Sequence, residues 1–368
     1  MKKYILAIDQ GTTGSRALIY DRSGRTVAGA YQEFPQYFPR PGWVEHDPEE
    51  IWMSVNASIQ KALSAIDPGL IAAIGITNQR ETSIVWNRAT GKPVYNAIVW
   101  QCRRSAARCE ELRRKKSESV CIRERTGLVI DAYFSATKIE WILEHVPGAL
   151  EKARQGALAF GTSDTWILSK LTGGRVHATD PTNASRTMLF NIDTKVWDPA
   201  LLKMFSIPGE MMPSVKLSSG AFGETDRIGR LPAGIPITGI AGDQQAALFG
   251  QACFEPGSVK NTYGTGSFIL MNAGSRRPRS DHGLIVTLGC GRAGESVYCL
   301  EGAVFIAGAA IQWLRDGLQI IDGARDSERM ARSVADTAGV YFVPAFVGLG
   351  APYWDPQARG AIIGLTRG

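Results

Sequence analysis

The sequence around the acidic residue Asp243 suggests a functional role for its carboxylate. Asp243 follows an apolar run at 235–240 that is typical of a buried strand, and the sequence after it has the spacing of a helix. A carboxylate at such a strand-to-helix junction either caps the helix or faces a cleft. This stretch alone leaves both interpretations open.

Two turns rich in Gly, Ser and Thr lie between apolar strands in distant parts of the chain. The first turn covers 9–16 and leads from a strand predicted at 4–8, and the second covers 264–267. Such turns offer free backbone N–H groups and hydroxyls on one concave surface, which suits phosphate oxygens. Arg16 adds a charge-assisted donor. An ordinary polar hairpin is the alternative for the first turn alone, but the repetition favours a duplicated phosphate-binding hairpin, one per domain.

An arginine and a glutamate, Arg80 and Glu81, come just after a strand predicted at 71–77. At a strand end they place a guanidinium fork and a carboxylate on the rim of a sheet, where both can bind the hydroxyls of a polyol. A mutual surface ion pair is the alternative interpretation.

The elements that must position these residues follow an α/β order. An Asp-Pro helix start at 47–48 precedes apolar residues at helical spacing, so the chain begins β-β-β-α-β. Further on, a Gly/Ala-rich sequence at 301–314 predicts a buried helix, with Gly308 and Gln312 one turn apart on one face. The sequence Gly-Cys-Gly-Arg-Ala-Gly at 289–294 matches a dinucleotide motif, but it leads into a strand, so we interpret it as a hairpin turn.

Composition excludes several other classes of protein. The 368 residues predict roughly two domains. The net charge is +6, and the basic clusters carry no interleaved aromatics, so we expect no nucleic-acid partner. The six cysteines show no metal-ligand spacing and predict free thiols in a reducing compartment. No stretch approaches the ~18 apolar residues of a membrane helix, so we expect a cytoplasmic protein with no membrane partner.

The sequence resembles the FGGY carbohydrate-kinase family along essentially its whole length. The matching stretches are 9–13, 41–48, 75–82, 100–104, 242–250, 261–266 and 348–354. The resemblance implies an α/β fold with two ribonuclease H-like (actin-like ATPase) domains, 1–250 on the substrate side and 251–368 on the nucleotide side. It implies ATP in the cleft between them, and ATP-dependent phosphorylation of glycerol to sn-glycerol 3-phosphate.

The resemblance also implies roles for individual residues. Asp243 is implied as the general base, and Asp9 is implied to act through Mg²⁺. The residues implied at glycerol are Arg80, Glu81, Trp100, Tyr133, Asp243, Gln244 and Phe268. Those implied at the nucleotide are Thr12, Thr13, Gly14, Arg16, Thr265, Gly308 and Gln312.

The chain departs from the family pattern in two places. The family continues well past the position of Gly368, so we expect the second domain to be incomplete here. The loop at 226–234 lacks the Gly-rich basic run that binds a sugar bisphosphate regulator in some bacterial members. Two alternatives therefore stay open: a kinase of another small polyol or ketose, and an inactive fragment that only binds ligand. The pair Trp100 and Phe268 favours a three-carbon substrate, and a homo-oligomer of the full-length chain also stays open.

Overall fold

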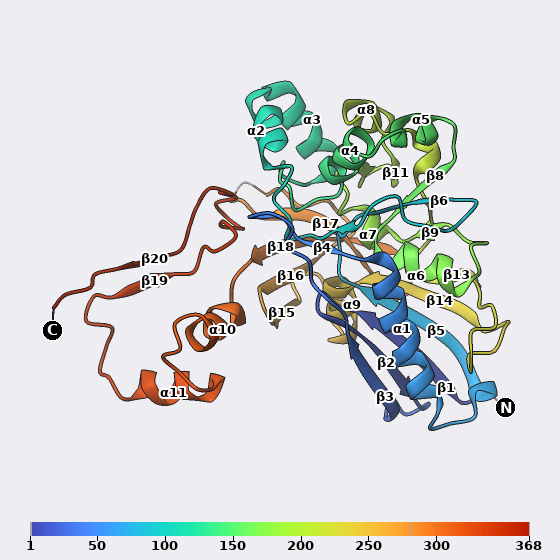
Figure 1. Ribbon diagram of the computed structural model, residues 1–368, viewed down its shortest axis with the longest axis horizontal. Coiled ribbons are helices and arrows are strands. Elements are labelled where there is room, and N and C mark those ends of the chain that lie inside the picture. The colour runs from blue at the N-terminus through green and yellow to red at the C-terminus, as the bar shows by residue number, and fades with distance from the viewer. Residues whose placement is uncertain (1, 281, 368) are drawn as a thin grey trace.

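A six-stranded mixed sheet organises the first half of the chain in the computed structural model, which describes residues 2–280 and 282–367 (Figure 1). Its strands lie in the order β13-β14-β5-β1-β2-β3. Their bounds are β1 (Tyr4–Gln10), β2 (Gly14–Tyr20), β3 (Thr26–Glu33), β5 (Ile71–Asn78), β13 (Ser219–Glu224) and β14 (Pro236–Gly242). Both β1 and β14 pair with β5 in parallel, so Gln10 and Gly242 flank Asn78 at one edge. Ligands of α/β proteins usually bind at such a carboxyl edge.

A four-stranded antiparallel sheet follows, in the order β15-β16-β18-β17. Its strands are β15 (Val259–Tyr263), β16 (Ser267–Gly274), β17 (Ile285–Cys290) and β18 (Ser296–Val304). The predicted hairpin turn at 289–294 is confirmed, because Cys290 pairs with Ser296 across it.

The buried helix predicted at 301–314 is wrong over its first half. Residues up to Val304 extend β18, whose side chains alternate between buried and more exposed positions with the period of a strand. Pairing with β16 and β17 on either side overrides the local helical preference of the small residues there. The helix α10 runs over Gly308–Asp316 instead, and each of its residues is at least partly exposed.

Three helices connect and cover the sheets. α1 (Pro48–Leu63) packs on β2 and β3, and its predicted start is confirmed by the Asp47 carboxylate, which accepts from the Glu49 N–H at 2.8 Å. α6 (Ser163–Leu171) packs on β5 and β14. α9 (Asp243–Gly250) contacts these two strands and also β15, β16 and β17. It therefore lies between the two sheets.

Apart from α6, the segment from β6 to β12 builds a layer of short elements over the carboxyl edge of the first sheet, together with the earlier strand β4. Its helices are α2 (Ala106–Arg114), α3 (Lys116–Thr126), α4 (Ala136–His145), α5 (Ala149–Arg154), α7 (Pro181–Ala184), α8 (Pro199–Met204) and the 3₁₀ turn Gly209–Met211; a second 3₁₀ turn, Pro68–Leu70, precedes β5. The short strands are β4 (Glu45–His46), β6 (Ile84–Asn87), β7 (Ala97–Ile98), β8 (Leu158–Gly161), β9 (Ala178–Thr179), β10 (Phe190–Asn191), β11 (Val196–Trp197) and β12 (Ser214–Val215). Its core includes Tyr133 and Phe134 and joins the second sheet through Phe268 and Phe305.

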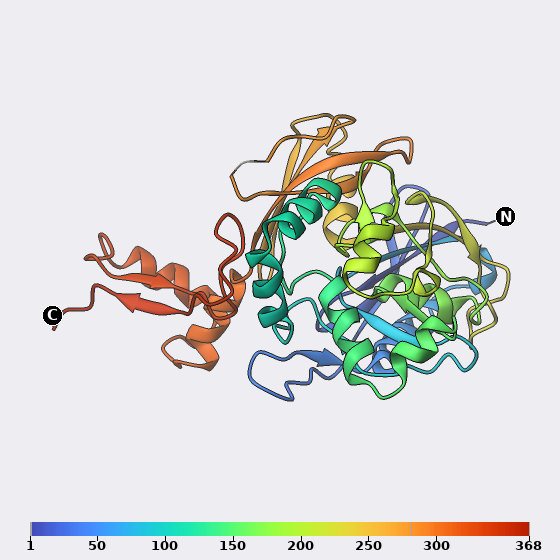
Figure 2. The ribbon, with the colours of Figure 1, turned by 90° about the horizontal axis from the view of Figure 1, so that it is seen from above.

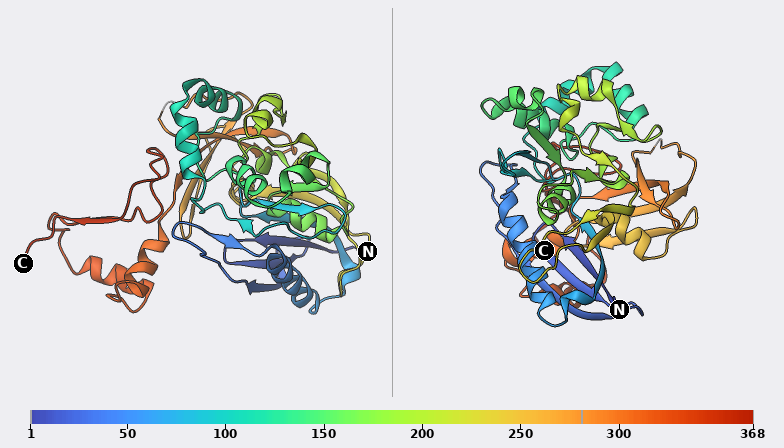
Figure 3. Two further views of the ribbon diagram at one scale, coloured as in Figure 1. Left: turned by 45° about the horizontal axis from the view of Figure 1, so that its top comes forward. Right: turned by 90° about the vertical axis from the view of Figure 1, so that its right-hand side faces the viewer.

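The helices and strands of the last part of the chain project away from both sheets, whereas the loop between its two strands returns and packs Trp354 into the main core (Figures 2 and 3). This part contains α10, α11 (Ala324–Arg332), β19 (Tyr341–Val343) and β20 (Ala361–Ile363). Tyr341 and Ile363 are exposed there. Within the described residues, no helix has the length and apolar character needed to cross a membrane. All six cysteines are free, as the sequence predicts.

Candidate functional site

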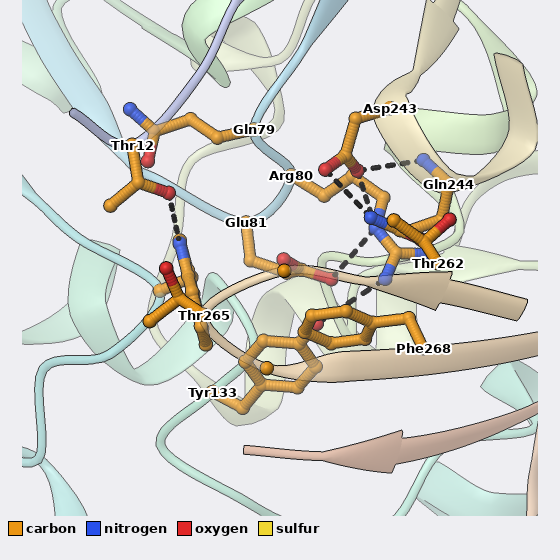
Figure 4. Close-up of a pocket in the computed structure, with 13 residues that line it drawn as sticks. Thr12, Gln79, Arg80, Glu81, Tyr133, Asp243, Gln244, Thr262, Thr265 and Phe268 are labelled. Atoms are coloured by element: carbon orange, nitrogen blue, oxygen red, sulfur yellow. Dashed lines mark hydrogen bonds and ion pairs between the residues drawn. The ribbon is translucent and has the colours of Figure 1, made fainter. Parts of the chain in front are cut away.

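A cavity of about 200 Å³ opens where the carboxyl ends of β1, β5 and β14 face the second sheet (Figure 4). All seven residues expected at glycerol line it, together with Thr12 and Thr265 of the nucleotide set. The complete lining is Thr12, Gln79, Arg80, Glu81, Trp100, Tyr133, Asp243, Gln244, Thr262, Gly264, Thr265, Gly266 and Phe268. The sequence therefore identified most of one real cavity wall from stretches far apart in the chain.

Asp243 is the first residue of α9 and faces this cavity. The helix N-cap is Gly242, so the interpretation of Asp243 as the N-cap is wrong. Its Oδ1 accepts from the backbone N–H of Gln244 at 2.7 Å, and its Oδ2 accepts from the side-chain Nε2 of Gln244 at 2.9 Å. The Arg80 Nε lies 3.4 Å from Oδ1, and 38% of the Asp243 side chain is exposed. The carboxylate is thus oriented by its neighbours and still accessible from the cavity.

Four buried charges form a closed ring of alternating sign beside Asp243, and we call this the four-charge ring. Arg80 donates to both carboxylate oxygens of Glu301, at 2.6 and 3.0 Å. Glu301 also accepts from Arg186 at 2.9 Å, and Arg186 donates to Glu81 at 2.6 Å. Glu81 lies 3.7 Å from the Arg80 Nε and closes the ring. Each member is at most 2% exposed, so the surface ion-pair interpretation of Arg80 and Glu81 is wrong.

The ring keeps Glu301 ionised despite its burial. Burial alone would raise the pKa of Glu301, but Arg186 and Arg80 outweigh burial and lower this pKa to about 2. Burial is the larger influence on Glu81, whose pKa is raised although the same two arginines oppose the shift. The two carboxylates of the ring thus differ in basicity.

The backbone of Glu81 is held in a conformation that non-glycine residues rarely adopt. Its φ is 58°, in the left-handed region. The carbonyl oxygen of Glu81 accepts from the Lys138 Nζ at 3.1 Å and from the Ser135 Oγ at 3.2 Å. Such strain persists only where surrounding contacts over-determine it, and it concentrates at functional sites. Two donors therefore hold the backbone of Glu81 in this conformation.

Aromatic side chains form the apolar wall of the cavity. The Trp100 ring lies edge-on to Tyr133 and to Phe268, with ring centroids 5.8 and 6.0 Å apart. The Trp100 Nε1 donates to the Thr12 Oγ1 at 3.0 Å, which ties this wall to the first Gly/Thr turn. Figure 4 shows the Tyr133 and Phe268 rings on one side of the polar groups. One wall thus suits carbon and the other suits hydroxyls.

The first Gly/Thr turn places Asp9 and Arg16 opposite each other on β1 and β2. Burial raises the pKa of Asp9, the Asp243 carboxylate raises it further, and Arg16 opposes both. At the turn itself, a Cβ on Gly14 would lie 2.8 Å from the Gln32 carbonyl oxygen, so a larger residue does not fit without a shift of the backbone. Thr13 is hydrogen-bonded to the Tyr31 hydroxyl at 3.3 Å. Thr13, Gly14, Arg16 and Asp9 belong to the walls of neither this cavity nor the next one.

A second cavity of about 320 Å³ lies beyond the second Gly/Thr turn. Its wall is Gly264, Thr265, Gly308, Ile311, Gln312, Arg315, Ala324 and Ser327. Gly264 and Thr265 also line the first cavity, so this turn is a shared wall. A Cβ on Gly308 would come within 2.6 Å of the Gly264 carbonyl oxygen, so the close approach of α10 to the turn requires glycine. The three nucleotide residues expected from the second half of the chain, Thr265, Gly308 and Gln312, are therefore brought together.

Sequence reasoning missed the residues that support this site. Arg186 belongs to a segment with only a polar, turn-like pattern, and Glu301 was placed in a helix. Lys260, Gln245 and Thr262 were also missed. The alternation along β18 would have placed Glu301 on the buried face, and a buried glutamate requires a cationic partner.

A carboxylate facing one cavity, with a second cavity across a shared Gly-Thr-Gly turn, is the arrangement of an enzyme that moves a group between two ligands. The sequence profile for the FGGY family of carbohydrate kinases, N-terminal domain, matches residues 4–250, and that for the C-terminal domain matches residues 259–368. This chain belongs to the FGGY family of carbohydrate kinases. The predicted α/β fold with two ribonuclease H-like domains is confirmed.

Within this family, the chain is similar to several glycerol kinases. The chain is 60% identical to the glycerol kinase of Carboxydothermus hydrogenoformans, over 100% of this chain and 74% of that relative. It is 59% identical to the glycerol kinase of an Escherichia coli strain, over 100% of this chain and 73% of that relative. Among solved structures, Plasmodium falciparum glycerol kinase with ADP aligns with a TM-score of 0.87 at 38% identity, covering 99% of this chain and 73% of that one.

Proposed function

We propose that this kinase transfers the terminal phosphoryl group of ATP to glycerol, forming sn-glycerol 3-phosphate, with Asp243 as the general base. The observation that carries the proposal is the small first cavity, in which Asp243 and the Arg80–Glu81 pair face an aromatic wall. Its volume of about 200 Å³ suits a three-carbon polyol. The two relatives named glycerol kinase, at 60% and 59% identity, support the same substrate.

The proposed substrate contacts follow from the donors and acceptors that the four-charge ring leaves free. The terminal nitrogens of Arg80 are committed to Glu301, Gln245 and Tyr133, and its Nε lies 3.4 Å from Asp243 and 3.7 Å from Glu81. A ligand hydroxyl would therefore bind the Nε–H in place of these longer ion-pair contacts. Glu81 supplies an acceptor for hydroxyl protons. Trp100 and Phe268 would cover the carbon chain, and Gln244 and Tyr133 would complete the polar contacts.

Asp243 would accept the proton of the hydroxyl that receives the phosphoryl group. General-base action of this kind contributes ~10²–10⁴-fold to the rate. Phosphoryl transfer proceeds through a loose transition state, so the site otherwise has to position the reactants and neutralise charge. The proposed contributors are thus mainly positioning groups around one base.

The second cavity would take the nucleotide, with Thr265, Gly308 and Gln312 in its wall. The first Gly/Thr turn, with Thr12, Thr13, Gly14 and Arg16, would offer backbone N–H groups and the guanidinium to the phosphates. Asp9 fits a role in holding Mg²⁺, because burial and then the Asp243 carboxylate raise the pKa of this acid, and a cation would relieve the repulsion between the two carboxylates. When bound, Mg²⁺ neutralises phosphate charge.

Two further proposals concern the domain boundary and the cellular compartment. We place the domain boundary between residues 250 and 251, where α9 ends, and the gap between the two matched profiles supports this choice. We place the protein in the cytoplasm, and the free state of all six cysteines supports a reducing compartment.

The decisive experiment measures ATP turnover with glycerol and with a panel of small polyols and ketoses, for the wild-type chain and for Asp243→Asn. We expect glycerol to be the preferred substrate and kcat to fall by ~10²-fold or more in the variant, with unchanged circular dichroism. A near-normal kcat in Asp243→Asn would show that Asp243 is not the general base. Turnover of another polyol in preference to glycerol would correct the substrate.

A further inference from the structure

Lys260 of β15 reaches the first cavity's edge from the second sheet and is almost completely buried, at 5% exposure. Its Nζ donates to the Gln244 Oε1 at 2.5 Å, the Thr262 Oγ1 at 2.9 Å and the Phe268 carbonyl oxygen at 3.2 Å. A lysine ammonium group has three donors and no acceptor. All of its donors are therefore used, and Lys260 affects a ligand only through its neighbours.

The contact with Lys260 fixes which end of the Gln244 amide faces which neighbour. Because the ammonium group only donates, the amide oxygen must face Lys260, and the amide nitrogen must face the other way. That nitrogen donates to the Asp243 Oδ2 at 2.9 Å. The reversed amide would place its oxygen against the carboxylate, where both groups only accept. Lys260 thus selects the orientation of Gln244 that stabilises ionised Asp243.

Both oxygens of the Asp243 carboxylate depend on the same residue. Oδ1 accepts the backbone N–H of Gln244 at 2.7 Å, while Oδ2 accepts its side chain. The Arg80 Nε lies 3.4 Å from Oδ1, and 38% of the Asp243 side chain stays exposed. A contact chain therefore runs from Lys260 through Gln244 to Asp243, from the second sheet to the first helix turn after β14.

We propose that Lys260 is a positioning residue of the phosphoryl-transfer site, which locks the Gln244 amide and thereby holds Asp243 in the orientation that receives the substrate's proton. This inference rests on the proposed function of Asp243. It assigns the second half of the chain a part in the acid–base chemistry, in addition to its nucleotide cavity.

A contribution to folding stability alone does not explain why a lysine is buried at position 260. Burial lowers the pKa of Lys260 to about 8, and the Arg80 guanidinium lowers it too, while Glu301, Asp243 and Cys253 oppose them. Burying a charged ammonium group costs free energy, and this cost offsets part of what its three hydrogen bonds contribute to stability. Stability and activity should therefore respond differently when the ammonium group is removed.

The test compares Lys260→Met, which keeps the length of the side chain but removes its charge and donors, with Gln244→Leu and with the double variant. We expect Lys260→Met to lower kcat at least tenfold with little change in the thermal midpoint. If Lys260 acts through Gln244, adding Lys260→Met to Gln244→Leu should change kcat less than twofold, because coupled residues are not additive. Lys216→Met is the matched control, since this lysine donates to the Ala221 carbonyl outside the site, and its kcat should match wild type.

Gln244→Glu separates charge from orientation. A glutamate keeps an oxygen for Lys260 but presents a second oxygen to Asp243, so we expect a loss of kcat at least as large as for Lys260→Met. Wild-type kcat in Lys260→Met, additive effects in the double variant, or full activity in Gln244→Glu would each overturn the proposal.

A readout without turnover keeps this inference distinct from the proposed function. If wild type does not phosphorylate glycerol, the proposed function fails, and the contact chain is then tested by NMR of the Gln244 side-chain amide in the full chain. We expect slow hydrogen exchange of this NH₂ group in wild type and in Lys216→Met, and faster exchange in Lys260→Met. Identical exchange in wild type and Lys260→Met would overturn the chain of contacts itself.

Discussion

Replacing Glu301 by glutamine removes one negative charge from the four-charge ring while conserving the shape of the side chain. Glu301 is fully buried and accepts three charge-assisted hydrogen bonds, two from Arg80 and one from Arg186. A glutamine whose oxygen faces Arg80 Nη2 and Arg186 keeps two of them, but its NH₂ group then meets Arg80 Nη1, another donor. The ring is left with two positive charges and only Glu81 to balance them.

The cost follows from these contacts. A hydrogen bond to a charged group contributes ~1.5–3 kcal/mol, and breaking a buried ion pair on one side costs ~3–5 kcal/mol. We therefore expect Glu301→Gln to lower the free energy of unfolding by about 3 kcal/mol at pH 7. Because Arg80 loses its anchor beside Asp243, we also expect the glycerol KM to rise about tenfold or more, with a smaller change in the ATP KM.

The pH dependence of this difference has a definite sign. The folded-state pKa of Glu301 is lowered from 4.5 to about 2, so the unfolded state binds the proton first as the pH falls. The stabilisation by ionised Glu301 is fully present above pH 4.5 and is lost as the pH falls toward 2. The stability gap between wild type and Glu301→Gln should therefore narrow over this range.

The assays are urea unfolding followed by circular dichroism at several pH values, and glycerol titrations of the initial rate at saturating ATP. Glu295→Gln is the control, since this exposed side chain accepts only from the Ala293 N–H in the turn before β18. Its stability should stay within ~0.5 kcal/mol of wild type. Wild-type stability and wild-type glycerol KM in Glu301→Gln would refute the positioning role that we assign to the ring.

Three further predictions concern other parts of the molecule. Gln312→Ala should raise the ATP KM severalfold and leave the glycerol KM unchanged, because Gln312 lines only the second cavity; an equal rise of both constants contradicts this. Burial lowers the pKa of His46 from 6.5 to about 3, so the unfolded state binds the extra proton and stability should fall as the pH drops from 6.5 toward 3; thermal unfolding should show a shallower fall in His46→Gln. Amide hydrogen exchange should be faster over 308–332 than in β1 and β5, because both helices of that segment lack fully buried residues; uniform protection contradicts this.

Local signals in the sequence located part of the wall of the first cavity. The Gly-Asp turn at Asp243, the Arg80–Glu81 pair and the first Gly/Thr turn each follow a strand, and parallel pairing of those strands brings their ends to one edge. The resemblance supplied Gln244, Phe268, Trp100 and Tyr133, and the local patterns of Trp100 and Tyr133 favour an ordinary core position.

The supporting residues could not be found in this way because their partners are remote in sequence. Glu301 is 221 residues from Arg80 and 115 residues from Arg186. No pattern within either stretch shows that these groups meet, and the helix expected at 301–314 placed Glu301 in the wrong element. Tertiary pairing of β18 with two neighbours decided its conformation, and local propensity did not.

The four-charge ring constrains how the two halves of the molecule can move. Arg80, Glu81 and Arg186 belong to the first half of the chain, whereas Glu301 lies on β18 of the second sheet. A rotation that separated them would leave unpaired charges in a poorly solvated place, which is costly. The axis of any rotation that moves one half relative to the other should therefore pass close to the four-charge ring. Displacement then grows with distance from this axis, so parts of the second half that are remote from Glu301 can move further than the residues around the small first cavity.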